Sequence, residues 1–443
     1  MENNIDKIID SKYNTAVVVG AGFGDEGKGK ITDWLSSQWA DIVVRGNGGP
    51  NAGHTVNANG TKIALRALPS GVLSKNIENV IGNGCVINLE ELVNEIEKVE
   101  TATERKINLK ISDRAHIITD YDIYVDKLIG KEIKTTGNGI GQCYADKSSR
   151  FGLRICDILI SEEHILNLLK NSYSHIIYQR YDLQGAISYN DKMNGNTPNP
   201  SNIVKKLYKY GKRIKKYVCD TSVYLNKEIQ YGRNILFEGA QAAMLDIDFG
   251  SYPYVTSSNT SSAGLAVGTG VAPKYFDNVI GVIKAYTTRV GAGPFVTEIE
   301  DEKLASVIRE TGHEYGTVTG RPRRIGWFDC NIVKQANRIN GFSGLAIMLL
   351  DVLTGLDEIK ICVDYVSDNG KLLKGIPASI LDLETTEPVY ITMPCWKEDI
   401  SNCKSFEELP PEAINYINEI ETQTGIPVKI ISVGPDRNQT IIK

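Results

Sequence analysis

The chain has 443 residues, 42% of them hydrophobic and 23% charged, with a formal net charge of −5 at pH 7. This mixture excludes a disordered chain, and the mild, evenly spread charge excludes the one-sided basic surface of a protein that binds duplex nucleic acid. The first residues lack an apolar secretory segment, and no later run approaches the roughly 18 apolar residues of a membrane span. We therefore expect a globular protein that stays in the cytoplasm and binds neither nucleic acid nor membrane.

The chain begins with a polar segment, followed by a strand, a loop and a helix. Residues 1–14 alternate charge and polarity, which predicts a flexible N-terminal extension. Residues 15–20, TAVVVG, form a β-branched run that stops at glycine, and apolar residues recur at helical spacing over residues 29–39. The glycine-rich stretch between them is therefore a turn that leads from a strand into a helix.

Further apolar runs predict more strands, and residues 89–100 predict a helix between two of them. The runs lie at residues 41–46, 80–87, 175–180, 234–240, 279–286, 345–353 and 359–365. No linker divides the chain, and its eight scattered cysteines show neither a disulfide pattern nor zinc-finger spacing. We expect an α/β fold in a single domain over residues 15–443. Its large, mostly parallel central sheet would be flanked by helices, as in P-loop NTPases, but with a variant phosphate loop.

The first glycine-rich loop resembles a phosphate-binding loop but departs from it twice. The segment from Gly22 to Lys28 matches G-x-x-x-x-G-K, whose backbone N–H groups can cradle a phosphate at a helix N-terminus. Gly29 stands where this pattern has a Ser or Thr that holds magnesium, and Asp25 places an anion where it would repel phosphate. Asp25 is therefore either a solvated turn residue or a group that binds a metal or transfers a proton.

A second glycine-rich loop, residues 45–56, follows the predicted strand DIVV, so we expect it beside the first loop at the carboxyl edge of the sheet. It contains His54, which is flanked by small residues that let a ligand approach closely. An ordinary half-buried position is expected instead for the other four histidines, His116, His164, His175 and His313. Asp25 and His54 would supply a base and an acid, which indicates group transfer.

Eight blocks of sequence run in order from residue 20 to residue 437. They are GDEGKGK, GGPNAGHT, TTGNGIGQCYADKSSRFGLR, FEGAQAAMLDIDFGSYPYVTSSNT, AYTTRVGAGPF, EYGTVTGRPRRIGWFD, LLDVLTGL and SVGPDR. Together they resemble the adenylosuccinate synthetase family over nearly the whole chain. The resemblance implies a ligase of de novo AMP biosynthesis. GTP would phosphorylate O6 of IMP, and the amino group of L-aspartate would displace that phosphate, giving adenylosuccinate, GDP and phosphate.

The resemblance also implies roles for individual residues. Asp25 matches the base that takes a proton from N1 of IMP, and His54 matches the acid that contacts the reacting phosphate. Lys28 and Gln241 complete the implied catalytic set. One Mg²⁺ per subunit would be held by Asp25 and by the carbonyl of Gly53.

Three ligand sites follow from the same resemblance. IMP would contact Asp25, Glu26, Gly27, Lys28, Asn51, Ala52, Gly53, His54, Thr136, Arg150, Gln241, Thr256 and Arg321. GTP, the co-substrate, would contact Gly24, Asp25, Glu26, Gly27, Lys28, Gly29, Lys30, Gly53, His54, Thr55, Arg323, Leu349, Leu350, Asp351, Ser432, Val433 and Gly434. Aspartate would contact Thr317, Val318, Thr319, Gly320, Arg321, Pro322 and Arg323.

Two of these residues imply more than contact. Asp351 would accept hydrogen bonds from guanine N1 and the exocyclic amine, a pattern that adenine cannot satisfy, so GTP is favoured over ATP. Arg150 would reach the IMP site of the neighbouring subunit, which implies a homodimer.

The sequence departs from the family at four places. Leu349 stands where a lysine stem usually covers the guanine ring, and Asn138 stands where an arginine often assists the aspartate site. Pro322 lies between the two loop arginines and should stiffen that turn, and Pro50 replaces a histidine of some members.

Two other functions fit parts of the pattern. A sister enzyme of the same fold, which makes a 2-amino-adenylosuccinate from (d)GMP, would lack the catalytic carboxylate, so Asp25 argues against it. A non-catalytic purine-nucleotide-binding regulator would lose its acid and base, yet Asp25 and His54 are both present. Competition between IMP and dGMP distinguishes the first alternative, and turnover distinguishes the second.

Overall fold

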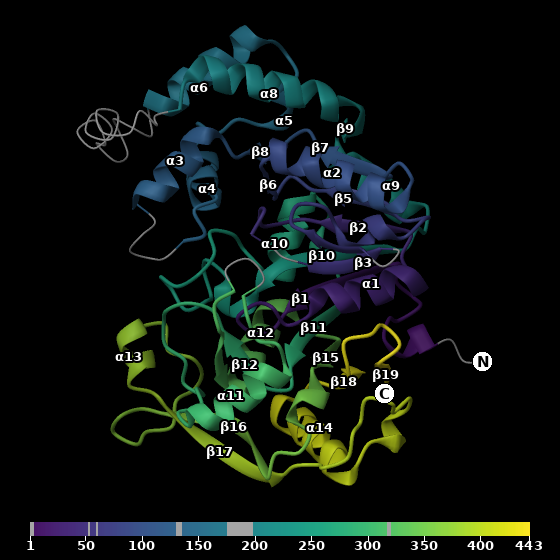
Figure 1. Cartoon of the computed structure of the whole chain (residues 1–443), viewed down its shortest axis with the longest axis vertical. Helices are drawn as coiled ribbons and strands as arrows, with labels where there is room; N and C mark the ends of the chain where they lie inside the picture. The colour runs from purple at the N-terminus through teal and green to yellow at the C-terminus, as the bar shows by residue number, and fades with distance from the viewer. Residues whose placement is uncertain (1–3, 52–53, 59–60, 130–134, 175–197, 317–319) are drawn as a thin grey trace. The chain divides into compact units, whose positions relative to one another are not determined.

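The computed structural model describes residues 4–51, 54–58, 61–129, 135–174, 198–316 and 320–443 (Figure 1). For residues 4, 54–58, 61–64, 129, 173 and 174 it describes the backbone alone. The chain forms two compact units. The first comprises residues 1–41, 232–263 and 272–443, and the second comprises residues 42–231 and 264–271.

The first unit contains strands in the order β19-β18-β15-β11-β1-β10. Their bounds are β1 (Thr15–Gly20), β10 (Ile235–Ala242), β11 (Asn278–Lys284), β15 (Gly344–Met348), β18 (Val428–Ser432) and β19 (Thr440–Ile442). All neighbours pair in parallel except β19, which runs antiparallel to β18. Every residue of β1 and β11 is buried, as expected for parallel strands that are covered on both faces.

Helices and two smaller sheets complete the first unit. The α-helices are α1 (Lys28–Gln38), α11 (Glu302–Thr311), α12 (Cys330–Asn340), α13 (Ile380–Glu384) and α14 (Pro411–Thr424). The 3-10 helices are η1 (Asn4–Lys7), η5 (Ala243–Leu245), η6 (Pro273–Tyr275), η7 (Leu350–Leu353) and η8 (Phe406–Glu408). The smaller sheets are formed by β12 (Thr287–Arg289) with β13 (Arg324–Gly326), and by β14 (Phe328–Asp329), β16 (Glu358–Val366) and β17 (Glu387–Pro394).

The core of the first unit joins these layers. Tyr416 and Ile420 of α14 belong to the same buried cluster as Ile347 of β15 and Ile361 of β16. The hydroxyl of Tyr416 donates a 2.6 Å hydrogen bond to the carbonyl of Ala285, just after β11. The cluster therefore packs α14 against the sheet, with one hydrogen bond at the carboxyl end of β11.

The second unit contains four parallel strands in the order β2-β5-β7-β9. They are β2 (Ile42–Arg45), β5 (Glu78–Ile81), β7 (Leu109–Ser112) and β9 (Val218–Cys219), beside the pairs β3 (His54–Ala58) with β4 (Thr61–Leu65) and β6 (Val86–Ile87) with β8 (His116–Ile117). Its helices are η2 (Ser70–Leu73), α2 (Leu89–Thr103), α3 (Asp120–Ile129), α4 (Ile140–Ser149), α5 (Ile155–Ile158), α6 (Glu162–Ser174), α8 (Pro200–Ile214), η4 (Lys215–Tyr217), α9 (Thr221–Gln230) and α10 (Ser262–Thr269), the last from Gly264 onward. Helices α6 and α8 lie side by side (Figure 1).

The predicted α/β fold, with a mostly parallel sheet flanked by helices, is confirmed. The strand predicted over residues 15–20 is β1, and the helix predicted over residues 89–100 lies within α2. The run at 175–180 lies outside the described residues. None of the helices in the described part of the chain combines the length and apolar character that a membrane crossing needs.

Two predicted strands were too long. The run at 80–87 is interrupted, because β5 ends at Ile81 and β6 begins at Val86. The glycines between them let backbones approach, since a Cβ on Gly84 would lie 2.1 Å from the carbonyl oxygen of Gly46. The run at 345–353 leaves the sheet after Met348, where Leu349 takes a left-handed φ of 59° and η7 follows.

The segment predicted to be a flexible extension, residues 1–14, includes a packed part. The side chains of Ile8 and Ile9 are buried within the first unit. The Lys429 Nζ donates to the carbonyl of Ile8 at 2.9 Å, and the N–H of Asp10 donates to Asn278 Oδ1 at 3.0 Å. The assignment of residues 15–443 to a single domain stays a prediction.

The close approach at Gly84 generates a stability prediction. We expect Gly84→Ala to lower the free energy of unfolding by about 3 kcal/mol, because the new methyl group would meet backbone rather than a flexible side chain. The control is Gly425→Ala at the C-cap of α14, where the space is open and only the left-handed φ of 70° is unfavourable. There we expect a loss of about 1 kcal/mol. Urea unfolding followed by circular dichroism measures both, and equal midpoints for Gly84→Ala and wild type would contradict the close approach.

Candidate active site

The loop between β1 and α1 forms an anion site that already holds a carboxylate. Gly24 and Gly27 have φ values of 94° and 87°, which glycine adopts without strain, and Gly27 caps α1. The buried Glu26 accepts through Oε1 from the N–H groups of Gly22 and Gly24, at 3.2 and 2.7 Å. Its Oε2 accepts from Lys28 Nζ at 2.6 Å. The loop amides and a lysine thus converge on an anion at a helix N-terminus, as a phosphate loop does.

Asp25 points away from this nest. Its side chain is 43% exposed, and its Oδ2 accepts from Arg323 Nη2 at 2.8 Å. Burial by itself would raise the pKa of Asp25, but Arg323, Lys284 and Lys28 outweigh it and lower that pKa below its ordinary value. Asp25 is therefore an ionised, accessible acceptor at neutral pH, suited to accept a proton or bind a cation.

Arg323 is held from its other side by residues that the sequence did not single out. Its Nη1 donates to Glu314 Oε2 at 2.5 Å, and Glu314 also pairs with Lys284 at 2.6 Å. All three are buried. One signal was available, because Lys284 is the only charged residue in the apolar run 279–286.

A second group lies at the carboxyl ends of β15 and β18. Lys30 Nζ donates to Ser432 Oγ at 2.8 Å, to the Gly434 carbonyl at 2.7 Å and to the Gln439 carbonyl at 3.0 Å. Burial lowers the pKa of Lys30 to about 8, although Asp351 nearby favours its charged form. Asp351 Oδ1 is buried without a hydrogen-bond partner within the described residues, so it can accept from a ligand.

Gln241 and Thr256 belong to the same unit. Gln241 has a positive φ of 67° near the end of β10, where the register with β1 shifts so that Gly20 faces Ala242. Gly20 is required there, because a Cβ would lie 2.6 Å from Glu26 Oε2. The N–H of Thr256 donates to the carbonyl of Leu245 at 2.8 Å.

Other predicted site residues lie in the second unit. Asn51 Oδ1 accepts from the N–H of Gly49 at 3.3 Å, and Thr136 is exposed. Arg150 is exposed at the C-cap of α4, with a φ of 68°. His54 and Thr55 begin β3, of which the backbone alone is described. Five predicted residues lie outside the described residues: Ala52, Gly53, Thr317, Val318 and Thr319.

The other histidines behave differently from one another. His116 and His164 are half-buried, as predicted. Burial and the cations Lys147 and Arg154 lower the pKa of His116 to about 4. His313 is exposed, so its half-buried prediction was wrong, and His175 lies outside the described residues.

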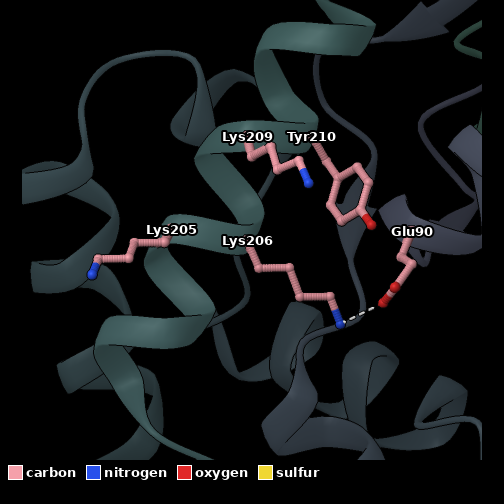
Figure 2. A pocket seen from close by; sticks show the side chains of 5 residues that line it. All are labelled: Glu90, Lys205, Lys206, Lys209 and Tyr210. Atoms are coloured by element: carbon pink, nitrogen blue, oxygen red, sulfur yellow. Dashed lines mark ion pairs between the residues drawn. The ribbon is translucent and has the colours of Figure 1, made fainter.

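An open cavity of about 420 Å³ lies elsewhere in the second unit, between α2 and α8. Figure 2 shows Lys206 directed toward Glu90, with which it forms a 2.8 Å ion pair. The lining residues are Glu90, Lys205, Lys206, Lys209 and Tyr210. None of them belongs to the predicted site.

Comparisons with known proteins identify the family of the chain. The family model for adenylosuccinate synthetase matches residues 17–441. The adenylosuccinate synthetase of Lactobacillus acidophilus is 48% identical over 439 residues, covering 97% of this chain and 98% of the relative. That of Clostridioides difficile is 45% identical over 440 residues, with the same coverage.

Two solved structures are also similar. The fully ligated adenylosuccinate synthetase from Plasmodium falciparum superimposes with a TM-score of 0.88 at 40% identity, covering 97% of this chain and all of that one. The succinoaminodeoxyadenylate synthetase of cyanophage S-2L, bound to dGMP and dATP, gives a TM-score of 0.59 at 19% identity, covering 97% and 95%. The second likeness shows the fold alone. The family match over nearly the whole chain, with relatives of nearly equal length at 45–48% identity, shows that the chain belongs to the adenylosuccinate synthetase family of ligases.

Proposed function

We propose that the chain joins L-aspartate to carbon 6 of IMP at the expense of GTP, in de novo AMP biosynthesis. O6 of IMP attacks the γ-phosphorus of GTP and GDP leaves, which gives 6-phosphoryl-IMP. The amino group of aspartate then attacks carbon 6, and phosphate leaves with O6. The observation that carries the proposal is an ionised Asp25 beside an anion-binding loop, in a chain of this family.

The first step needs a base and cations. Asp25, which is ionised at neutral pH, takes the proton from N1 of IMP as O6 becomes nucleophilic. Arg323 contacts Asp25, Lys28 lies close enough to lower its pKa, and both offset the charge of the transferred phosphoryl group. His54 donates toward the reacting phosphate, and Gln241 orients IMP.

Asp25 also suits the expected Mg²⁺, one per subunit. Magnesium in nucleotide sites is commonly held by one or two protein oxygens while phosphates and water supply the rest. A single half-exposed carboxylate beside a phosphate loop fits that pattern, and the described residues contain no cluster of three His, Cys, Asp or Glu side chains that would form a protein cage. Asp25 and the Gly53 carbonyl would hold the ion, which offsets phosphate charge when bound.

The guanine of GTP lies against Asp351. Its buried, unpartnered Oδ1 needs a donor, and guanine offers donors at N1 and the exocyclic amine. Ser432, Val433 and Gly434 contact the same base, with the loop held in place by Lys30.

The other ligands use the remaining residues. Asn51, Thr136 and Thr256 hold IMP, and Arg321 and Arg323 bind the carboxylates of aspartate through forked donors. Arg150 reaches the IMP of a second subunit in a cytoplasmic homodimer, and its exposed position at the C-cap of α4 supports this role.

An assay of product formation with GTP or with ATP as the nucleotide tests the proposal. We expect adenylosuccinate from IMP, aspartate, Mg²⁺ and GTP, little product with ATP, and a kcat lowered about 10³-fold in Asp25→Asn. Asp368→Asn, an exposed carboxylate in a turn, is the control and should match wild type. Product from dGMP but none from IMP would reassign the substrate. No product from either nucleotide would contradict the proposal that the chain is a catalyst.

Base selection by Asp351 can be tested separately. An amide at this position loses the carboxylate acceptor, so we expect Asp351→Asn to raise the KM for GTP about 30-fold. Xanthosine triphosphate carries an oxygen in place of the exocyclic amine, so the amide N–H₂ of the variant should donate to it and restore turnover. An unchanged KM for GTP, with no gain for xanthosine triphosphate, would remove Asp351 from the base site.

A further inference from the structure

Arg323 belongs to a network of charged side chains, most of which are buried. Lys284, at the end of β11, and Glu314 have exposed side-chain fractions of 3% and 1%. Lys284 Nζ donates to both oxygens of Glu314, at 2.6 and 2.8 Å, and to Thr288 Oγ1 at 2.8 Å. The three N–H donors of the lysine therefore each have an acceptor.

Glu314 collects donors from three side chains. Besides Lys284, the hydroxyl of Tyr286 donates to Oε1 at 2.6 Å, and Arg323 Nη1 donates to Oε2 at 2.5 Å. Burial by itself would raise the pKa of Glu314, but Lys284 and Arg323 lower it below its ordinary value, so the carboxylate is charged. Together with Asp25, the network contains two cations and two anions, and its charge is balanced.

Arg323 and Glu314 are also joined through their backbones. The N–H of Arg323 donates to the carbonyl of Glu314 at 2.9 Å, and the N–H of Gly316 donates to the carbonyl of Arg321 at 2.8 Å. Glu314 thus contacts Arg323 through both its backbone and its side chain. The buried Glu314 therefore fixes the position of Arg323.

The Nε–H of Arg323 is not used by the network. Its Nη1 is engaged by Glu314 and its Nη2 by Asp25, while Nε is buried without a hydrogen-bond partner within the described residues. An unpaired buried N–H is unfavourable, so this edge is suited to an oxygen of a bound anion.

We propose that Glu314, with Lys284 as its counter-ion, is a positioning residue that fixes the guanidinium of Arg323 between Asp25 and the anionic substrate. This rests on the function proposed above. Stability alone does not account for the network, because buried ion pairs lose hydration that an apolar pair of similar volume would not. Glu314 contacts no substrate and acts through Arg323.

The test is Glu314→Gln in the full chain, with steady-state kinetics for each substrate. A guanidinium displaced by about 1 Å can lower turnover on the order of 10²-fold, so we expect kcat/KM for aspartate to fall by about that factor. The KM for IMP should change less than about twofold, since the residues proposed to hold IMP do not depend on Glu314 for their positions. A merely structural role would reduce the active fraction and leave all KM values unchanged, and that result would overturn the proposal.

The control variant is Glu298→Gln. Glu298 Oε1 accepts from Arg324 Nε at 2.7 Å, so the change breaks the ion pair of the next arginine along the chain, at a half-exposed site. We expect wild-type kinetics, because exposed pairs contribute little.

A double-mutant cycle tests whether Glu314 acts through Arg323. In an Arg323→Ala background, Glu314→Gln should lower kcat/KM by less than about threefold further, because the group that it positions is gone. Independent, multiplicative losses would overturn the proposal. If Glu314→Gln does not fold, Lys284→Met combined with Glu314→Gln removes both buried charges and should show the same kinetic loss. A wild-type chain inactive with IMP, aspartate and GTP would instead overturn the proposed function.

Discussion

The candidate site of the first unit depends on the pairing of two adjacent carboxylates in a loop that, in the proposed function, binds phosphate. Unpaired, Asp25 and Glu26 would repel that phosphate. Glu26 is buried against the loop amides and Lys28, while Asp25 pairs with Arg323 and keeps an exposed fraction of 43%. Since each carboxylate has its own cation, the loop keeps an electropositive helix N-terminus and still offers one ionised, accessible oxygen.

Several residues of the predicted site have an unfavourable backbone conformation. Six non-glycine residues of the described chain have positive φ, and four of them belong to the predicted site: Asp25, Arg150, Gln241 and Leu349. Left-handed conformations are unfavourable for side chains with a Cβ and persist where the surroundings fix them. At Arg150 and Leu349 a helix cap accounts for the conformation, while Asp25 and Gln241 adopt theirs at positions proposed to contact IMP.

The sequence predicted what depends on neighbours along the chain. The β-branched run 15–20 and the glycines after it specify the strand, loop and helix, and Lys28 follows from the same spacing. Lys284 and Glu314 were missed, although the charge of Lys284 stands out in its apolar run, because their importance follows from the contact of Arg323 with Asp25, which are 298 positions apart. The break in the run 80–87 was missed for the same reason, since Gly84 is packed against Gly46, which is distant in sequence.

Leu349 shows which part of base recognition can change. Its half-buried side chain packs against the core of the first unit and has no hydrogen-bonding group, so it can cover a ring but cannot distinguish guanine from adenine. In the proposed function, discrimination therefore falls on Asp351 and on the backbone near Ser432. That backbone is held by Lys30, whose buried ammonium accounts for its lowered pKa. In that proposed site, leucine in place of lysine at position 349 would remove a charge from the cover of the base and leave Asp351 and the backbone near Ser432 unchanged.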